Sequence, residues 1–183
     1  LEHIQNDESI KAVVIRVNSP GGAVVASDEI SKKIKEVKEK KPVVVSFGDV
    51  SASGGYYISA GATEIVANPA TLTGSIGVIA QFPQYSALME KIGVEMRTFK
   101  SGEFKDIGSP ERPVTDAETL ILQTMIAEAY DQFVKVIADG RKMDEAKVRE
   151  LADGRIYTGK QAKENGLIDG FGNTDVAIER ASA

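Results

Sequence analysis

Short apolar runs alternate with helical patterns in the first half of this chain. Apolar, mostly β-branched residues fill 12–17 and 43–47, and a turn that contains glycine follows each run. Between the two runs, Ile30, Ile34 and Val37 recur at helical spacing among charged residues. Apolar strands joined by helices are typical of a parallel sheet built from βαβ units. The sequence therefore predicts an α/β fold with a mostly parallel sheet.

The second half of the chain is predicted to be mainly helical. Thr115 and Glu118 have the spacing of a capping box, and an apolar face continues beyond them for several helical turns. No linker or internal repeat divides the chain, so we predict a single domain over residues 1–183. The other elements that we expect are a helix at 85–92, a strand at 94–99, a polar loop at 101–113, and helices near 144–151 and 175–180.

Composition argues against several classes of protein. The 183 residues carry a net charge of −5 with acids and lysines interspersed, which disfavours a nucleic-acid partner. With no cysteine and a single histidine, His3, we predict no disulfide and no metal site. We also expect no cofactor. No apolar run approaches the roughly 18 residues of a membrane-spanning helix. The abrupt start at Leu1 suggests the trimmed soluble part of a longer chain. We interpret the lysine-rich run 32–41 as a solvated helix face.

Ser53 is the first candidate for chemistry, because it lies in a turn of small residues between an apolar run and a predicted helix. Gly54 and Gly55 allow a sharp backbone turn, and the free N–H groups of a helix that begins there could stabilise an oxyanion. If Ser53 is a nucleophile, its base is not expected to be the distant His3, and a lysine is the next candidate. The alternative is a serine that only caps the helix.

A second glycine turn, at 18–22, also separates a predicted strand from a predicted helix. The carboxyl ends of neighbouring parallel strands lie at one edge of a sheet, which is where sites form. The N–H groups of Gly21 and Gly54 could therefore make a two-donor oxyanion hole. An ordinary Pro-Gly-Gly turn is the alternative, and neither glycine turn has the spacing of a phosphate-binding loop.

Lys105, in the polar loop, is a candidate general base. A lysine base must be uncharged, and burial in an apolar environment lowers the pKa of a lysine. Phe104 and Ile107 could supply such an environment, but the local sequence does not distinguish Lys105 from Lys100. A solvated loop lysine is the simpler interpretation. Ser75, in a glycine-containing segment, could hold the lysine amine through a hydrogen bond.

At these residues the chain resembles the signal peptide peptidase A family, which comprises bacterial membrane-associated serine peptidases of the Clp protease/crotonase fold group. The resemblance implies that fold, with βαβ units, a mostly parallel sheet and a helical second half, in a single peptidase domain. The segments that carry it are Arg16–Gly22, Ala52–Tyr57, Thr71–Val78, Lys100–Lys105, and Gly154–Gly159 with Gly166–Asp169.

The resemblance also implies roles for individual residues. Ser53 would be the nucleophile, Lys105 the general base and Ser75 the serine that orients the lysine, with the amides of Gly21 and Gly54 as the oxyanion hole. The substrates would be cleaved signal peptides and other apolar peptides. An N-terminal membrane anchor missing from this chain, a location at the extracytoplasmic face of the cell membrane, and assembly into homo-oligomers are further expectations.

Three alternatives to this function stay open at this point. A related Ser-Lys peptidase would cut a specific membrane-protein partner. A crotonase-like acyl-CoA enzyme would use the two glycine amides on a thioester, but it would leave Ser53 and Lys105 unexplained. An inactive scaffold would bind peptides or assemble rings. If the chain is a peptidase, Ser53 and Lys105 would form a catalytic dyad. The serine of one protomer could also pair with the lysine of a neighbouring protomer.

Overall fold

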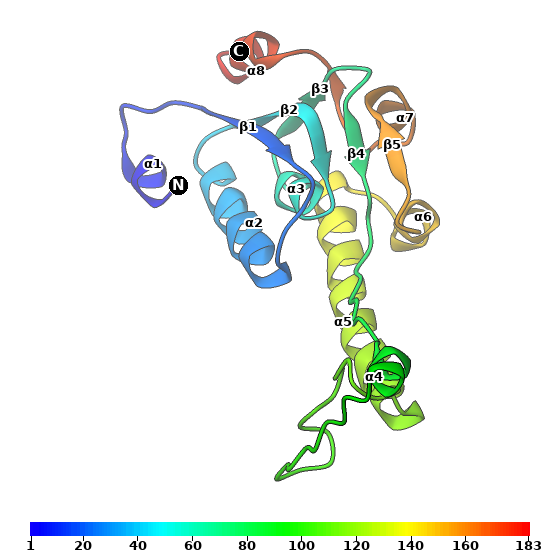
Figure 1. The fold of residues 1–183 in the computed structure, drawn as a ribbon. Helices are drawn as coiled ribbons and strands as arrows, with labels where there is room; N and C mark the ends of the chain where they lie inside the picture. The colour runs from blue at the N-terminus through cyan, green and yellow to red at the C-terminus, as the bar shows by residue number, and fades with distance from the viewer. The chain divides into compact units, whose positions relative to one another are not determined.

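The computed structural model describes residues 1–183 (Figure 1), and they form two compact units. Unit 1 comprises Leu1–Gly77 and Asp131–Ala183, and unit 2 comprises Val78–Tyr130. None of the helices combines the length and the apolar content that crossing a bilayer requires. The single peptidase domain expected from the sequence stays a prediction.

Strands and helices alternate through the first half of the chain, as predicted. The elements are α1 (Glu2–Asn6), β1 (Val13–Ser19), α2 (Val24–Lys38), β2 (Val43–Ala52), α3 (Gly54–Ser59), β3 (Glu64–Ala67), β4 (Leu72–Gly74), α4 (Ser86–Ile92), α5 (Asp116–Arg141), α6 (Glu145–Leu151), β5 (Ile156–Thr158), α7 (Gly159–Glu164), β6 (Gly170–Phe171) and α8 (Thr174–Ala181).

The predicted strand at 94–99 is wrong. These residues are irregular and exposed. A strand needs a neighbour for its N–H and C=O groups, and unit 2 contains no other strand. No element was predicted between the helices near 144–151 and 175–180, and the structure has the short elements β5, α7 and β6 there.

Six strands form one mostly parallel sheet. The long strand β2 pairs in parallel with β1 along one side, and with β3 and β4 along the other. β3 continues to β6 in parallel, whereas β4 pairs with β5 in antiparallel orientation. The register places Ala52 opposite Gly74, so β2 and β4 end together at one edge of the sheet.

Helices cover both faces of this sheet (Figure 1). α2 packs on Val43, and α8 packs on the next residue, Val44. Neighbouring side chains of a strand point to opposite faces, which is why consecutive apolar residues in β2 support helices on two sides. The α2 face also buries Val13, Ile34 and Val37, and the α8 face buries Val66, Ala177 and Ala181.

Lysines of α2 and of the segment after it hold the N-terminal helix. Lys33 Nζ donates to Gln5 Oε1 at 2.9 Å, and Lys41 Nζ donates to the carbonyl oxygen of Ile4 at 2.6 Å. The interpretation of 32–41 as a solvated face is therefore wrong for these lysines. Their ammonium groups satisfy an amide oxygen and a carbonyl oxygen of α1 and fix it to α2 and to the segment that follows α2.

A partly buried ion pair ties the end of α5 to the sheet. Arg141 Nη2 donates to Asp169 Oδ1 at 2.7 Å, and Asp169 Oδ2 also accepts the backbone N–H of Ile65 in β3 at 2.7 Å. Burial alone would raise the pKa of Asp169, but the hydrogen bonds and charge of Arg141 lower it below its usual value. The carboxylate of Asp169 therefore stabilises the folded state at every pH at which it is ionised.

We expect Asp169→Asn to lower the free energy of unfolding at pH 7 by about 2 kcal/mol, because Arg141 loses its charged acceptor. A carboxyl with a depressed folded pKa contributes stability above its unfolded pKa and loses it as the pH falls through the folded pKa. The difference between wild type and variant should thus shrink between pH 5 and pH 2 in urea denaturation. Asp139→Asn, at an exposed position on α5, is the control. An equal loss at pH 7 and pH 2 would contradict this account.

Candidate active site

Ser53 lies at the junction of β2 and α3 in a backbone conformation that side chains rarely adopt. Its φ is 51° and its ψ is −120°. Its N–H donates to the carbonyl of Gly74 at 2.8 Å, and its own carbonyl accepts the N–H of Tyr57 at 2.9 Å. These two hydrogen bonds hold the strained residue from both sides. Backbone strain of this kind concentrates at functional sites.

The side chain of Ser53 does not cap the helix that it precedes. Ser53 occupies the N-cap position of α3, yet its hydroxyl accepts no hydrogen bond from the first turn. A capping serine normally accepts the N–H two or three residues onward, and that bond stabilises the helix by about 1 kcal/mol. The capping interpretation therefore does not explain this residue, and its Oγ is left for another partner.

The two glycine turns lie against each other. A Cβ on Gly21 would lie 3.0 Å from the Cβ and 3.2 Å from the Oγ of Ser53. A Cβ on Gly54 would lie 2.9 Å from the nitrogen of Gly22. Gly21 also has a φ of +137°, so a side chain there would be strained even without the contact. The structure thus brings Gly21, Gly54 and Ser53 together. That the N–H groups of Gly21 and Gly54 form an oxyanion hole stays a prediction.

Ser75 follows β4 in the same way that Ser53 follows β2. Because Ala52 and Gly74 are paired in register, the two serines leave neighbouring parallel strands at one edge of the sheet. Ser75 has a φ of 48°, and its N–H donates to the carbonyl of Arg155 at 2.8 Å. Two of the three non-glycine residues with positive φ are therefore these neighbouring serines, which concentrates the backbone strain at this edge.

Ser27 also contacts the site, and the sequence did not single it out. A Cβ on Gly54 would lie 2.7 Å from Ser27 Oγ, which is buried between α2 and α3. A signal was present in the sequence: Ser27 and Ser31 extend the buried stripe of Ile34 at helical spacing. Small polar residues on an otherwise apolar stripe indicate a close approach of two helices.

Lys105 lies in unit 2, in a series of turns over 101–108. Its side chain is exposed and makes no hydrogen bond or ion pair. Lys100 differs, because its Nζ pairs with Asp106 Oδ1 at 2.7 Å and donates to the carbonyl of Glu103 at 2.7 Å. The sequence left both lysines open as the base. The structure shows that the amine of Lys100 is engaged and that of Lys105 is free, and the partnership of Lys105 with Ser53 stays a prediction.

An ion-pair network braces these turns. Arg112 Nη2 donates to Asp106 Oδ1 at 2.8 Å, and Arg112 Nη1 donates to Glu118 Oε2 at 2.8 Å. Glu118 Oε2 also accepts the N–H of Thr115 at 2.9 Å, which confirms the predicted capping box. Arg112 lowers the pKa of Glu118 to about 2 and holds the pKa of Asp106 well below its usual value. Both carboxylates are therefore ionised at neutral pH.

Comparison with known protein sequences identifies relatives across the chain. The family described as Peptidase family S49 matches residues 35–183. A protein of Enterococcus faecium, provisionally named signal peptide peptidase SppA, is 48% identical over 180 residues, which cover 98% of this chain and 52% of that protein. The protein named serine protease SPPA, chloroplastic, of Arabidopsis thaliana is 40% identical over 179 residues, which cover 97% of this chain and 26% of that protein. The chain thus spans about half the length of the first relative and about a quarter of the second.

Comparison with solved structures identifies the fold. A ClpP1 mutant from Listeria monocytogenes superposes with a TM-score of 0.58 at 20% sequence identity, covering 94% of this chain and 83% of that chain. The predicted Clp protease type of α/β fold, with its mostly parallel sheet, is therefore confirmed.

We expect Ser53→Gly to be more stable than Ser53→Ala by about 1 kcal/mol, because glycine relieves the strain at φ 51°. Both variants lack the hydroxyl, so their difference in unfolding free energy reports the Cβ and the backbone conformation, and not the hydroxyl. At the preceding residue, which is in the strand, Ala52→Gly should instead lower stability by about 1 kcal/mol. Urea denaturation of the three variants makes the comparison. A Ser53→Gly variant less stable than Ser53→Ala would show that the turn is not strained.

Proposed function

The chain belongs to peptidase family S49, and from this premise we propose that it is a serine endopeptidase whose nucleophile is Ser53. The resemblance of the sequence to the signal peptide peptidase A family is confirmed by the same comparison. One observation carries the proposal for Ser53. Its Oγ caps nothing, and the glycine turn at Gly21 lies directly against it.

The proposed mechanism is acyl transfer in two steps. Neutral Lys105 removes the proton of Ser53 as Oγ attacks the carbonyl carbon of the peptide bond. The amides of Gly21 and Gly54 stabilise the oxyanion, by about 3 kcal/mol for each donor. The lysinium then protonates the leaving amine. The same lysine activates a water that hydrolyses the acyl-enzyme, and Ser75 orients the lysine amine.

The exposure of Lys105 supports a further part of this proposal. A lysine accepts a proton only while it is neutral, and removal from water is the usual cause of that state. The side chain is exposed in the single chain. We therefore propose that a neighbouring protomer of a homo-oligomer, together with the bound peptide, covers Lys105 and completes the dyad.

The proposed substrates are cleaved signal peptides and other apolar peptides at the membrane surface. The name of the Enterococcus relative supports this substrate class. We also propose that a membrane anchor elsewhere in a longer chain holds the domain at the extracytoplasmic face. A related peptidase that cuts one specific membrane protein, an acyl-CoA enzyme and an inactive peptide-binding scaffold are the competing proposals.

We expect Ser53→Ala and Lys105→Ala each to lower kcat/KM for a fluorogenic apolar peptide by at least about 10³-fold, because either change removes the dyad. The double variant should be no slower than either single variant, since the two residues act as a unit. Lys91→Ala, at another exposed lysine of unit 2, is the control and should keep full activity. Activity that survives Lys105→Ala would contradict its role as the base. An inert wild type would favour the scaffold.

We expect a mixture of Ser53→Ala and Lys105→Ala chains to recover activity if they are unfolded and reassembled together. When a site takes its serine from one protomer and its lysine from the next, random mixing at equal amounts leaves about a quarter of the sites complete. Each variant reassembled alone is the control. A mixture that stays inactive would show that the dyad forms within one chain.

A further inference from the structure

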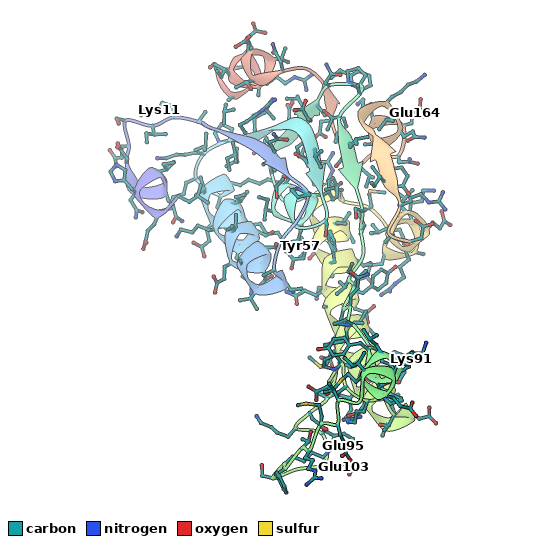
Figure 2. The ribbon with its side chains drawn as sticks, in the orientation of Figure 1. Lys11, Tyr57, Lys91, Glu95, Glu103 and Glu164 are labelled. Atoms are coloured by element: carbon teal, nitrogen blue, oxygen red, sulfur yellow. The ribbon has the colours of Figure 1, made fainter.

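Tyr57 lies where α2, α3 and α5 meet (Figure 2). Its hydroxyl donates to Asp28 Oδ1 at 2.9 Å. Gln132 Nε2, from α5, donates to the same Asp28 oxygen at 2.8 Å and to the hydroxyl of Tyr57 at 3.1 Å. The ring of Tyr57 is buried and packs on Phe133 with the ring centroids 5.0 Å apart. Three helices are thus joined at one carboxylate oxygen.

This junction is directly connected to both glycine turns. The N–H of Tyr57 makes the first helical hydrogen bond of α3, to the carbonyl of Ser53 at 2.9 Å. Asp28 lies in the second turn of α2, the helix that follows Gly21 and Gly22. The Tyr57–Asp28 hydrogen bond therefore links the helix that begins at one turn to the helix that begins at the other.

The charges strengthen this link at neutral pH. Lys32 Nζ lies 2.6 Å from Asp28 Oδ2, and this hydrogen bond lowers the pKa of Asp28 below its usual value. Burial, with the neighbouring Asp28, raises the pKa of Tyr57 to about 12. Asp28 is therefore an ionised acceptor and Tyr57 a protonated donor. Hydrogen bonds to a charged group are roughly twice as strong as those between neutral groups.

We propose that Asp28, Tyr57 and Gln132 form a positioning network that fixes the distance between the amides of Gly21 and Gly54. The inference rests on the proposed function, in which those amides bind the oxyanion. The three side chains act through the backbone of the two turns and not on the substrate. Small displacements of oxyanion donors weaken stabilisation of the transition state more than binding of the ground state. The network should therefore affect kcat rather than KM.

The neighbouring tyrosine provides a matched control. Tyr56 is fully buried in the same helix, and its hydroxyl donates to the carbonyl of Leu167 at 2.8 Å. Tyr56→Phe and Tyr57→Phe each remove one buried hydroxyl and keep the ring. Only the second change breaks the link to α2. A loss of stability alone would affect both variants, whereas a positioning role affects kcat in one of them.

The test measures kcat and KM for an apolar peptide, with unfolding free energies to confirm that each variant is folded. We expect Tyr57→Phe and Asp28→Ala each to lower kcat by about tenfold with KM within about twofold of wild type. The double variant should be no slower than Asp28→Ala, because both changes break one link. Asp28→Asn, which keeps an acceptor oxygen, should restore most of kcat. Tyr56→Phe and Glu29→Ala should keep the wild-type kcat.

Three outcomes separate this inference from the proposed function. If hydrolysis depends on Ser53 but kcat is unchanged in Tyr57→Phe, the positioning network is overturned and the proposed function is not. Additive losses in the double variant also overturn it, since Asp28 and Tyr57 would then act separately. Hydrolysis that persists in Ser53→Ala overturns the proposed function and the inference with it. If Asp28→Ala does not fold, Gln132→Ala, at an exposed side chain, replaces it in the comparison.

Discussion

The hydrogen bond from the N–H of Ser53 to the carbonyl of Gly74 is the constraint on which the site depends. It extends the parallel pairing of β2 and β4 by one residue, past Ala52, and fixes the point at which the chain leaves the sheet. A shift of the register by one residue would turn every side chain of β4 to the other face. The neighbouring positions of Ser53 and Ser75 are therefore a direct consequence of strand register.

Close packing of the glycine turns depends on that same point of departure. Ser53 can hold a φ of 51° only because β4 on one side and the first turn of α3 on the other restrain it. The contact with Ser53 then leaves little room for a Cβ on Gly21. The regular sheet around this place stabilises the strained and crowded residues, and helices pack on both faces of that sheet.

Local patterns predicted the elements whose causes are local. The apolar runs gave β1 and β2, and the pair Thr115 and Glu118 gave the start of α5, because capping is decided within one turn. The strand expected at 94–99 failed because pairing depends on a neighbour that is absent from unit 2. Lys100 and Lys105 could not be separated, since what distinguishes them is the ion pair of Lys100 with Asp106. The Tyr57–Asp28 contact joins distant positions and left no pattern in the sequence.

The proposed mechanism divides its parts between the two units in a way that suits their chemistry. A nucleophile and its oxyanion donors must be held within a fraction of an ångström, and a sheet edge with packed helix ends provides that precision. A lysine base has a different requirement, which is removal from water at the moment of reaction. Lys105 is exposed in turns that Arg112 braces, so its amine is open to a covering surface. Activity would then depend on whatever covers that lysine, which links catalysis to assembly and to the bound peptide.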